Sequence, residues 1–217
     1  MNPNPMMPTP SVCIFPSSLR ILNSAFGFTA ESYGCDTGDV KFGLTSAELS
    51  RKLASGPVVT MERDDRYEVH GTAREKALEN INKQLAEWGI TMPPATAVLF
   101  DFGLGRFMEI GETEFWVANE PDLGYCAKFL FVFAGQTCPY HHHIVKHGTF
   151  FVLKGRVLMK YGSEERVMEQ GDVLAIPPGV GHSFTGITNA LLLEASMPST
   201  LHDNFFADHE IGQNGMI

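Results

Sequence analysis

The stretch "HHHIVKHGTF", residues 141–150, holds four of the eight histidines in this chain of 217 residues. Successive side chains of a β-strand point to opposite faces, so we expect His141 and His143 to share one face and His142 to point the other way. Two imidazoles on one face of a strand can bind a single metal ion. A solvent-exposed polar run is the alternative interpretation, because short motifs also occur by chance.

The spacing of glycine and proline around this stretch gives the histidines a context. Gly135 lies six positions before His141, and Gly155 follows "TFFVLK". A second group lies in "GDVLAIPPGVGH", which contains Gly171, Pro177, Gly179 and His182. Glycines at such positions allow tight turns, and proline fixes the loop that leads back to the last histidine.

These spacings resemble the two motifs of the cupin proteins, G-x5-H-x-H-x4-E-x6-G and G-x5-P-x-G-x2-H. One fixed position differs: where the first motif has Glu, this chain has Gly148. The Asn that often follows the last histidine by four positions is also absent, and Gly186 stands there. Two motifs in this order, fifteen residues apart, are a specific indication of the fold.

Segments between residues 95 and 196 support the same fold. Short runs rich in β-branched and aromatic residues alternate with glycine turns, which is typical of an antiparallel barrel or sandwich. The eight segments read "ATAVLFDFG", "ETEFWVAN", "YCAKFLFVFAG", "GTFFVLKG", "RVLMKYG", "DVLAIPPG", "HSFTG" and "NALLLEAS". We therefore expect an all-β cupin barrel that spans residues 96–208.

The residues outside this barrel are expected to form an N-terminal arm, 1–95, and a C-terminal tail, 209–217. Two helices are predicted in the arm, at 45–55 and 72–88, because each opens with Thr and has Glu three positions later, the capping-box pattern. The second helix places its apolar residues on one face. These residues are Leu78, Ile81, Leu85 and Trp88.

Composition excludes several classes of protein. The net charge of −9 argues against a nucleic-acid partner, which requires a basic face. No apolar run reaches the roughly 20 residues that a membrane span needs, so no membrane partner is expected. The start of the chain does not read as a secretion signal. The four cysteines contain no C-x-x-C pair and indicate reduced thiols of a cytoplasmic protein.

A longer resemblance covers about residues 75–208. The chain is similar to the D-lyxose isomerase family in "DFGLG" at 101–105, "YCAK" at 125–128 and "GQTCPYHHH" from Gly135. The segment "LLLEASMPSTLHDNF" matches the end of the family pattern in outline. Where the family has K-x-E-T-F, this chain has "KHGTF".

The resemblance implies a metal-dependent aldose–ketose isomerase with a small sugar substrate. Family members interconvert D-lyxose and D-xylulose, and often D-mannose and D-fructose, through an enediol. Their barrel holds one divalent ion, which implies His141, His143 and His182 as ligands here. Mn²⁺ is expected, with Zn²⁺, Fe²⁺ and Ni²⁺ as other candidates. A metal ion on the substrate oxygens stabilises the negative charge that develops there.

Four further residues are candidates for the site. Lys128, in an apolar strand, is expected to have a catalytic role, although lysine is usually a surface residue. Glu194 lies among apolar residues and is either paired in the core or a catalytic base with a raised pKa. Phe150 and Asp203 are expected to bind substrate; a wall of the core and a capping carboxylate are the alternatives.

Gly148 leaves the fourth ligand open. The ion could be held by three histidines and water, His147 could substitute if a bulge turns it inward, or the site could be impaired. The missing carboxylate leaves two other functions to consider: a three-histidine cupin dioxygenase and a non-catalytic sugar-binding cupin. Because such barrels expose sheet edges, we also expect a homodimer.

Overall fold

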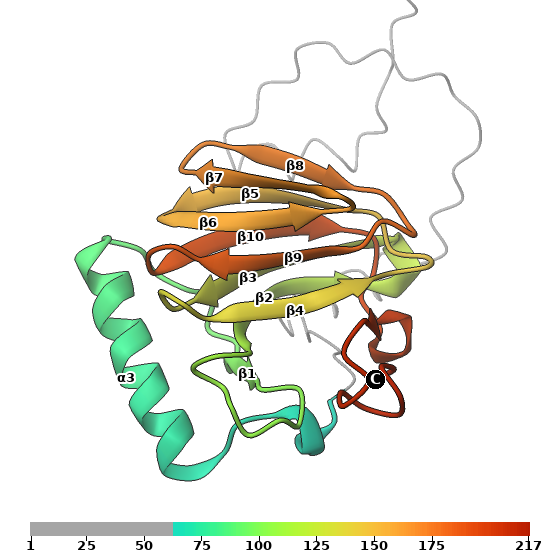
Figure 1. The fold of residues 1–217 in the computed structure, drawn as a ribbon. Coiled ribbons are helices and arrows are strands. Elements are labelled where there is room, and N and C mark those ends of the chain that lie inside the picture. The colour runs from blue at the N-terminus through green and yellow to red at the C-terminus, as the bar shows by residue number, and fades with distance from the viewer. Residues whose placement is uncertain (1–62) are drawn as a thin grey trace, which may run out of the picture. The chain divides into compact units, whose positions relative to one another are not determined.

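The computed structural model describes residues 63–217, so the helix predicted at 45–55 lies outside the described residues. Two antiparallel sheets face each other (Figure 1). One has the strand order β1 (Val98–Phe100), β2 (Glu112–Glu120), β3 (Tyr125–Val132), β10 (Ala190–Ser196), β5 (Gly148–Lys154) and β8 (Val173–Ile176). The other has the order β11 (Phe205–Phe206), β4 (Thr137–His142), β9 (His182–Gly186), β6 (Arg156–Tyr161) and β7 (Glu164–Glu169).

The all-β prediction is confirmed, and each of the eight predicted segments contains a strand. The sequence does not single out β7 or β11. The β7 strand reads "EERVME" and buries Met168 alone, because it lies at the edge of its sheet and faces solvent. A charged edge strand of this kind lacks the apolar alternation on which strand prediction depends.

Apolar side chains form one part of the interior between the two sheets. Val152 and Leu192 from the six-stranded sheet and Val157, Met159 and Phe184 from the five-stranded sheet belong to one cluster of buried side chains. Strand alternation explains why these residues are buried together, since every second residue of a strand faces the same side. The polar side chains of the candidate site lie on this same interior face.

Helix α3 (Gly71–Glu87) confirms the second predicted helix and packs on the outer face of the six-stranded sheet (Figure 1). Ile81 and Leu85 are buried against a second apolar cluster that includes Phe131 and Leu191. The predicted capping box is wrong. The N-cap is His70, which makes no side-chain capping hydrogen bond, so the apolar face rather than a cap fixes this helix. Two short 3₁₀ helices, η2 (Asp65–Tyr67) and η3 (Pro121–Leu123), lie before β1 and between β2 and β3.

The last residues of the chain fold back onto the barrel. β11 follows a third 3₁₀ helix, η4 (Leu201–Asp203), and pairs with β4. The Phe206 backbone N–H donates to the Gly215 carbonyl at 2.7 Å, and Ile211 is fully buried in the main core. Residues 209–217 thus contact the core, although the boundary at 208 remains a prediction. Among the described residues, no helix is both long and apolar enough to cross a membrane.

Candidate metal centre and substrate pocket

Three histidines meet inside the barrel. Each of His141, His143 and His182 offers one ring nitrogen, and these nitrogens all lie within 4.8 Å of one another. Strands β4 and β9 create the arrangement, because His141 and His182 are directly opposed partners in that ladder and His143 follows the end of β4. His142 points away, as predicted, and stacks on Phe205 with ring centroids 5.3 Å apart.

Each of the three rings is held by a backbone carbonyl. The Nδ1 atoms lie 2.8 Å from the Pro139 oxygen for His141, 2.6 Å from the Asp203 oxygen for His143 and 3.2 Å from the Val180 oxygen for His182. A carbonyl oxygen can only accept, so Nδ1 carries the proton in all three rings. The lone pair is therefore on Nε2, which is the arrangement found in metal-binding histidines.

Burial keeps these imidazoles neutral. It lowers the pKa of His143 to about 3 and that of His182 to about 4, and the pKa of His141 falls well below its ordinary value for the same reason. Neutral imidazoles are the form that binds a metal ion. The donor set, its tautomers and its charge state thus fit a divalent cation.

Gly148 lies on the interior face of β5, opposite Ser196 of β10. A Cβ atom built on it would lie 3.5 Å from Ser196 Cβ and 3.8 Å from Glu194 Oε1, both ordinary contacts. His147 does not replace the missing carboxylate. Its side chain is exposed and it is not part of the three-histidine group. His147 directly precedes β5, which begins at Gly148.

A row of side chains crosses the six-stranded sheet beside the histidines. The register pairs Trp116 of β2 with Lys128 of β3, Lys128 with Glu194 of β10, and Glu194 with Phe150 of β5. All four line one pocket together with His141 and His143. The two predicted catalytic residues, Lys128 and Glu194, are therefore neighbours, and the Phe150 ring centroid is 5.8 Å from that of His182.

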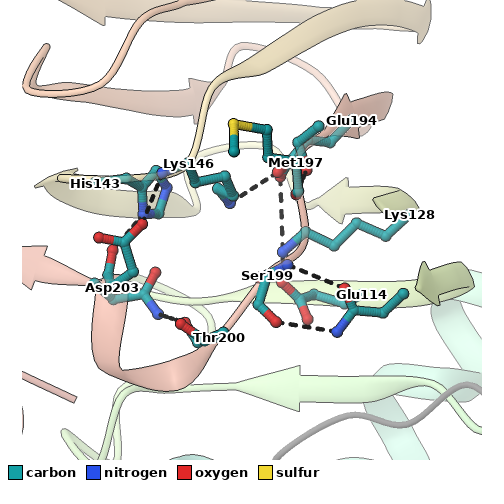
Figure 2. Close-up of polar contacts among 12 residues, drawn as sticks. Glu114, Lys128, His143, Lys146, Glu194, Met197, Ser199, Thr200 and Asp203 are labelled. Carbon is teal, nitrogen blue, oxygen red and sulfur yellow. Dashed lines mark hydrogen bonds and ion pairs between the residues drawn. The ribbon is translucent and has the colours of Figure 1, made fainter. Parts of the chain in front are cut away.

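Glu194 lies between two ammonium groups (Figure 2). Lys146 Nζ donates to its Oε1 at 2.8 Å, and Lys128 Nζ is 3.6 Å from its Oε2. Burial alone would raise the pKa of Glu194, but the two lysines outweigh burial and hold the pKa below its ordinary value. The expected raised pKa is therefore wrong: Glu194 is a paired, buried carboxylate, and its catalytic role stays a prediction.

Two glutamates of β2 complete the buried charges and were not predicted as site residues. Glu114 accepts hydrogen bonds from Lys128 and from Trp116 Nε1, the latter at 2.9 Å. Glu112 is also buried, and desolvation, reinforced by the charge of Glu114, raises its pKa to about 7. In the sequence, "ETEFW" reads as an ordinary alternating strand. The sequence does not show that the glutamate side of this strand faces the interior of the barrel; the structure does.

Lys146 and Asp203 are linked through the loop between β4 and β5. The Asp203 carboxylate accepts from the backbone N–H groups of Ile144 and Lys146, each at 2.8 Å, and from Val145 at 3.1 Å. Its carbonyl oxygen accepts from His143. Asp203 thus fixes the loop that carries one imidazole and one lysine of the site. Its predicted contact with substrate remains a prediction.

Comparison with known proteins defines the class first. Residues 130–195 match the cupin domain family, and this chain is a cupin-fold protein. Solved structures of similar fold include the L-ribose isomerase of Cellulomonas parahominis with L-ribose, at 16% identity and a TM-score of 0.54, covering 69% of this chain and 97% of that one. The L-ribose isomerase of Geodermatophilus obscurus matches at 15% identity and a TM-score of 0.54, covering 65% and 93%.

Within that class, the chain is similar in sequence to a sugar isomerase. It is 28% identical over 181 residues to the D-lyxose ketol-isomerase of Cohnella laeviribosi, which covers 69% of this chain and 98% of the relative. The resemblance noted from the sequence motifs is therefore supported by a similarity that covers most of this chain. The structural likeness, at its low identities, establishes the shared fold.

Proposed function

We propose that this chain is a metal-dependent aldose–ketose isomerase of the D-lyxose isomerase type. The observation that carries the proposal is a group of three neutral imidazoles, two of which line one pocket with an ionised carboxylate, Glu194, and two ammonium groups. That set provides a cation site and proton-transfer groups together. The similarity to a D-lyxose ketol-isomerase supports the same reaction class.

We assign each residue of the site a role. A divalent ion held by His141, His143 and His182, Mn²⁺ in our proposal, would stabilise negative charge on the substrate oxygens. The Glu194 carboxylate takes the proton from one carbon and returns it to the next. The Lys146 ammonium donates a proton to the oxygen that becomes a hydroxyl. Lys128 stays charged and holds Glu194 and Glu114 in position.

Turnover of D-lyxose and D-mannose in the presence of Mn²⁺ tests this function. We expect Glu194→Gln to lower the rate by roughly 100-fold or more, since it keeps the shape and removes the base. Glu165→Gln, on the exposed face of β7, is the matched control and should keep the full rate. Equal rates for the two variants would remove Glu194 from the mechanism.

In our proposal, Gly148 leaves the ion without a carboxylate ligand, and the isomerisation rate of neutral sugars is therefore low. The Gly148→Glu variant should gain Mn²⁺ affinity and isomerase activity together, because a carboxylate is the ligand type that Mn²⁺ prefers. A variant that gains the metal and no activity would contradict isomerisation of these sugars.

The three-histidine set without a carboxylate also favours a second candidate, a cupin dioxygenase with Fe²⁺. Oxygen uptake separates the two, since an isomerase consumes none. Sugar binding with neither turnover nor oxygen uptake would leave the non-catalytic cupin.

A further inference from the structure

Glu112 is the one glutamate of the pocket that has no cationic partner in the described part of the chain. Lys128 pairs with Glu114 and Glu194, and Lys146 pairs with Glu194 (Figure 2). Glu112 is in no ion pair within residues 63–217. Its side chain nevertheless lines the same pocket, and the residue is only 8% exposed. A buried carboxylate without a partner is costly, so this group is a candidate for a functional role.

The contacts of Glu112 place its carboxyl group on the side of the pocket that leads to the histidines. Glu112 and Glu114 are two positions apart on β2 and therefore share the interior face of this strand. The Cys138 thiol of β4 hydrogen-bonds to the Glu112 carboxyl group, and its Sγ lies 4.0 Å from His141 Nδ1. A single side chain thus separates Glu112 from a candidate ligand of the ion.

The titratable groups that act on Glu112 come from four strands. They are Glu114 of β2, Lys128 of β3, Glu194 of β10 and Cys138 of β4. The β1 strand opposes Glu112 with the apolar Phe100. Burial and the charge of Glu114 raise the pKa of Glu112 to about 7, although Lys128 acts in the opposite direction. Near neutral pH, a new charge in the pocket therefore decides whether this carboxyl group holds its proton.

A divalent ion on the three histidines would be such a charge. The group of His141, His143 and His182 contains no carboxylate within the described part of the chain, and Gly148 adds none. Neutral imidazoles leave both positive charges of the ion in place, and a bound cation changes the pKa of the groups around it. A nearby positive charge favours the ionised form of a carboxyl group.

We propose that Glu112 is the charge-compensating carboxylate of the metal centre. It loses its proton to the solvent when the ion binds, and the negative charge left in the pocket stabilises the ion without coordinating it. The chain lacks the carboxylate ligand at position 148 but in this way still provides one negative charge for the ion. Because binding and ionisation are linked, each strengthens the other by the same factor.

The direction of the pH dependence follows from the two states of Glu112. Without the ion, the carboxyl group is mostly protonated at pH 5, about half protonated at pH 7 and mostly ionised at pH 8, as its pKa of about 7 requires. With the ion its pKa is lower, so the group is ionised at pH 7. Binding at pH 7 therefore releases about half a proton, and the affinity for the ion rises between pH 5 and pH 8.

Calorimetric titration of the metal-free chain with Ni²⁺ tests the proposal. Two non-coordinating buffers of different ionisation enthalpy are used at pH 7, because the difference in heat counts the protons released. We expect about half a proton per ion, and binding about 10-fold tighter at pH 8 than at pH 5, which corresponds to a pKa shift of about one unit. The imidazoles contribute no proton at pH 7, since burial keeps them neutral. An affinity independent of pH, or binding without proton release, would overturn the proposal.

Variants of Glu112 assign the proton. Glu112→Gln keeps the shape of the side chain and cannot ionise, so it should release no proton. We expect it to match the unaltered chain at pH 5 and to bind Ni²⁺ about 10-fold more weakly than that chain at pH 8. Glu112→Asp retains a carboxyl group and should retain the proton release. Glu165→Gln, on exposed β7, is the control and should behave as the unaltered chain.

The outcome separates this role from a structural one. A residue that only supports the fold would change the unfolding free energy, but it would not change the number of protons released per ion. Proton release by Glu112→Gln equal to that of the unaltered chain would assign the proton to another group and reject the proposal. No sugar is present in the titration, so the result does not depend on the isomerase function.

Discussion

Ionisation of Glu112 lowers the stability of the folded protein. Its pKa rises from 4.5 to about 7 because it is buried beside Glu114. The folded state therefore holds the proton between pH 4.5 and 7 while the unfolded state releases it. Stability from this group is complete below pH 4.5 and is lost as the pH rises through 7.

The Glu112→Gln variant should remove that pH dependence. We expect the metal-free unaltered chain to lose up to roughly 3 kcal/mol of unfolding free energy from Glu112 between pH 4.5 and 8, at about 1.4 kcal/mol per pKa unit. The glutamine side chain is neutral at every pH, so the unfolding free energy of the variant should change less over this range. Urea unfolding at pH 5 and pH 8 measures the difference, with Glu165→Gln as the exposed control. Parallel curves for the two variants would contradict the assignment.

The loop between β4 and β5 shows how one side chain can organise a segment. The Asp203 carboxylate binds three consecutive backbone N–H groups, and its carbonyl orients His143. Without the carboxylate these three N–H groups would lose their shared acceptor, and the loop would lose its fixed path. The metal site thus depends on a residue 60 positions away from His143.

We therefore expect Asp203→Ala to weaken metal binding by roughly 10-fold or more, as is typical when a group that supports a metal ligand is lost. Calorimetric titration with Zn²⁺ or Ni²⁺ measures this. Asp208→Ala is the control, because Asp208 accepts a hydrogen bond from the Glu210 backbone in a turn and is not part of the pocket lining. Identical metal affinities for the two variants would show that the loop keeps its conformation without the Asp203 carboxylate.

Helix α3 packs on the outer face of the sheet and does not contribute residues to the candidate site. Ile81 is fully buried in the outer apolar cluster, which is separate from the cluster between the sheets. Ile81→Ala should lower the unfolding free energy by roughly 2–5 kcal/mol through lost contacts and a cavity. The exposed neighbour Glu79→Ala should change it by less than about 0.5 kcal/mol. We expect metal affinity to be unchanged in both, so a loss in Ile81→Ala would indicate that the helix also supports the site.

At the scale of the whole molecule, we expect metal binding and folding to be linked. The ligands come from β4, the residue after it, and β9, so an ion would join two strands that the unfolded chain leaves far apart. At a metal concentration about 100 times the dissociation constant the gain is about 2.7 kcal/mol, which corresponds to a rise in Tm of roughly 5–10 °C. Thermal unfolding with metal and with EDTA should show this shift. His182→Ala should abolish it, and a shift that survives in that variant would place the ion elsewhere.

Assembly is a further prediction at this scale. Strands β7 and β8 lie at sheet edges, β7 is mostly exposed, and open edges favour pairing with a second chain. We expect a homodimer, with a mass close to twice the 23.9 kDa of one chain, by light scattering at micromolar concentration. A mass of one chain under those conditions would contradict the expectation.

The sequence by itself determined the fold class and two members of the three-histidine group. The spacing of Gly135, His141 and His143 is local along the chain, and strand alternation places the two histidines on one side. His182 joins them through the pairing of β4 with β9. The apolar faces of the strands and of α3 are equally local, which is why eight strands and the helix could be predicted. The cap of α3 could not, because packing rather than a capping side chain decides where that helix begins.

Only the tertiary structure decided the partners of the buried charges. Lys146 meets Glu194 from 48 positions away, and Lys128 meets Glu114 across a strand pair. These contacts depend on the register of β2, β3, β10 and β5, which no single segment specifies. The pKa of a buried carboxylate depends on which charges lie around it, so the same residue type is held ionised at Glu194 and half-protonated near neutral pH at Glu112.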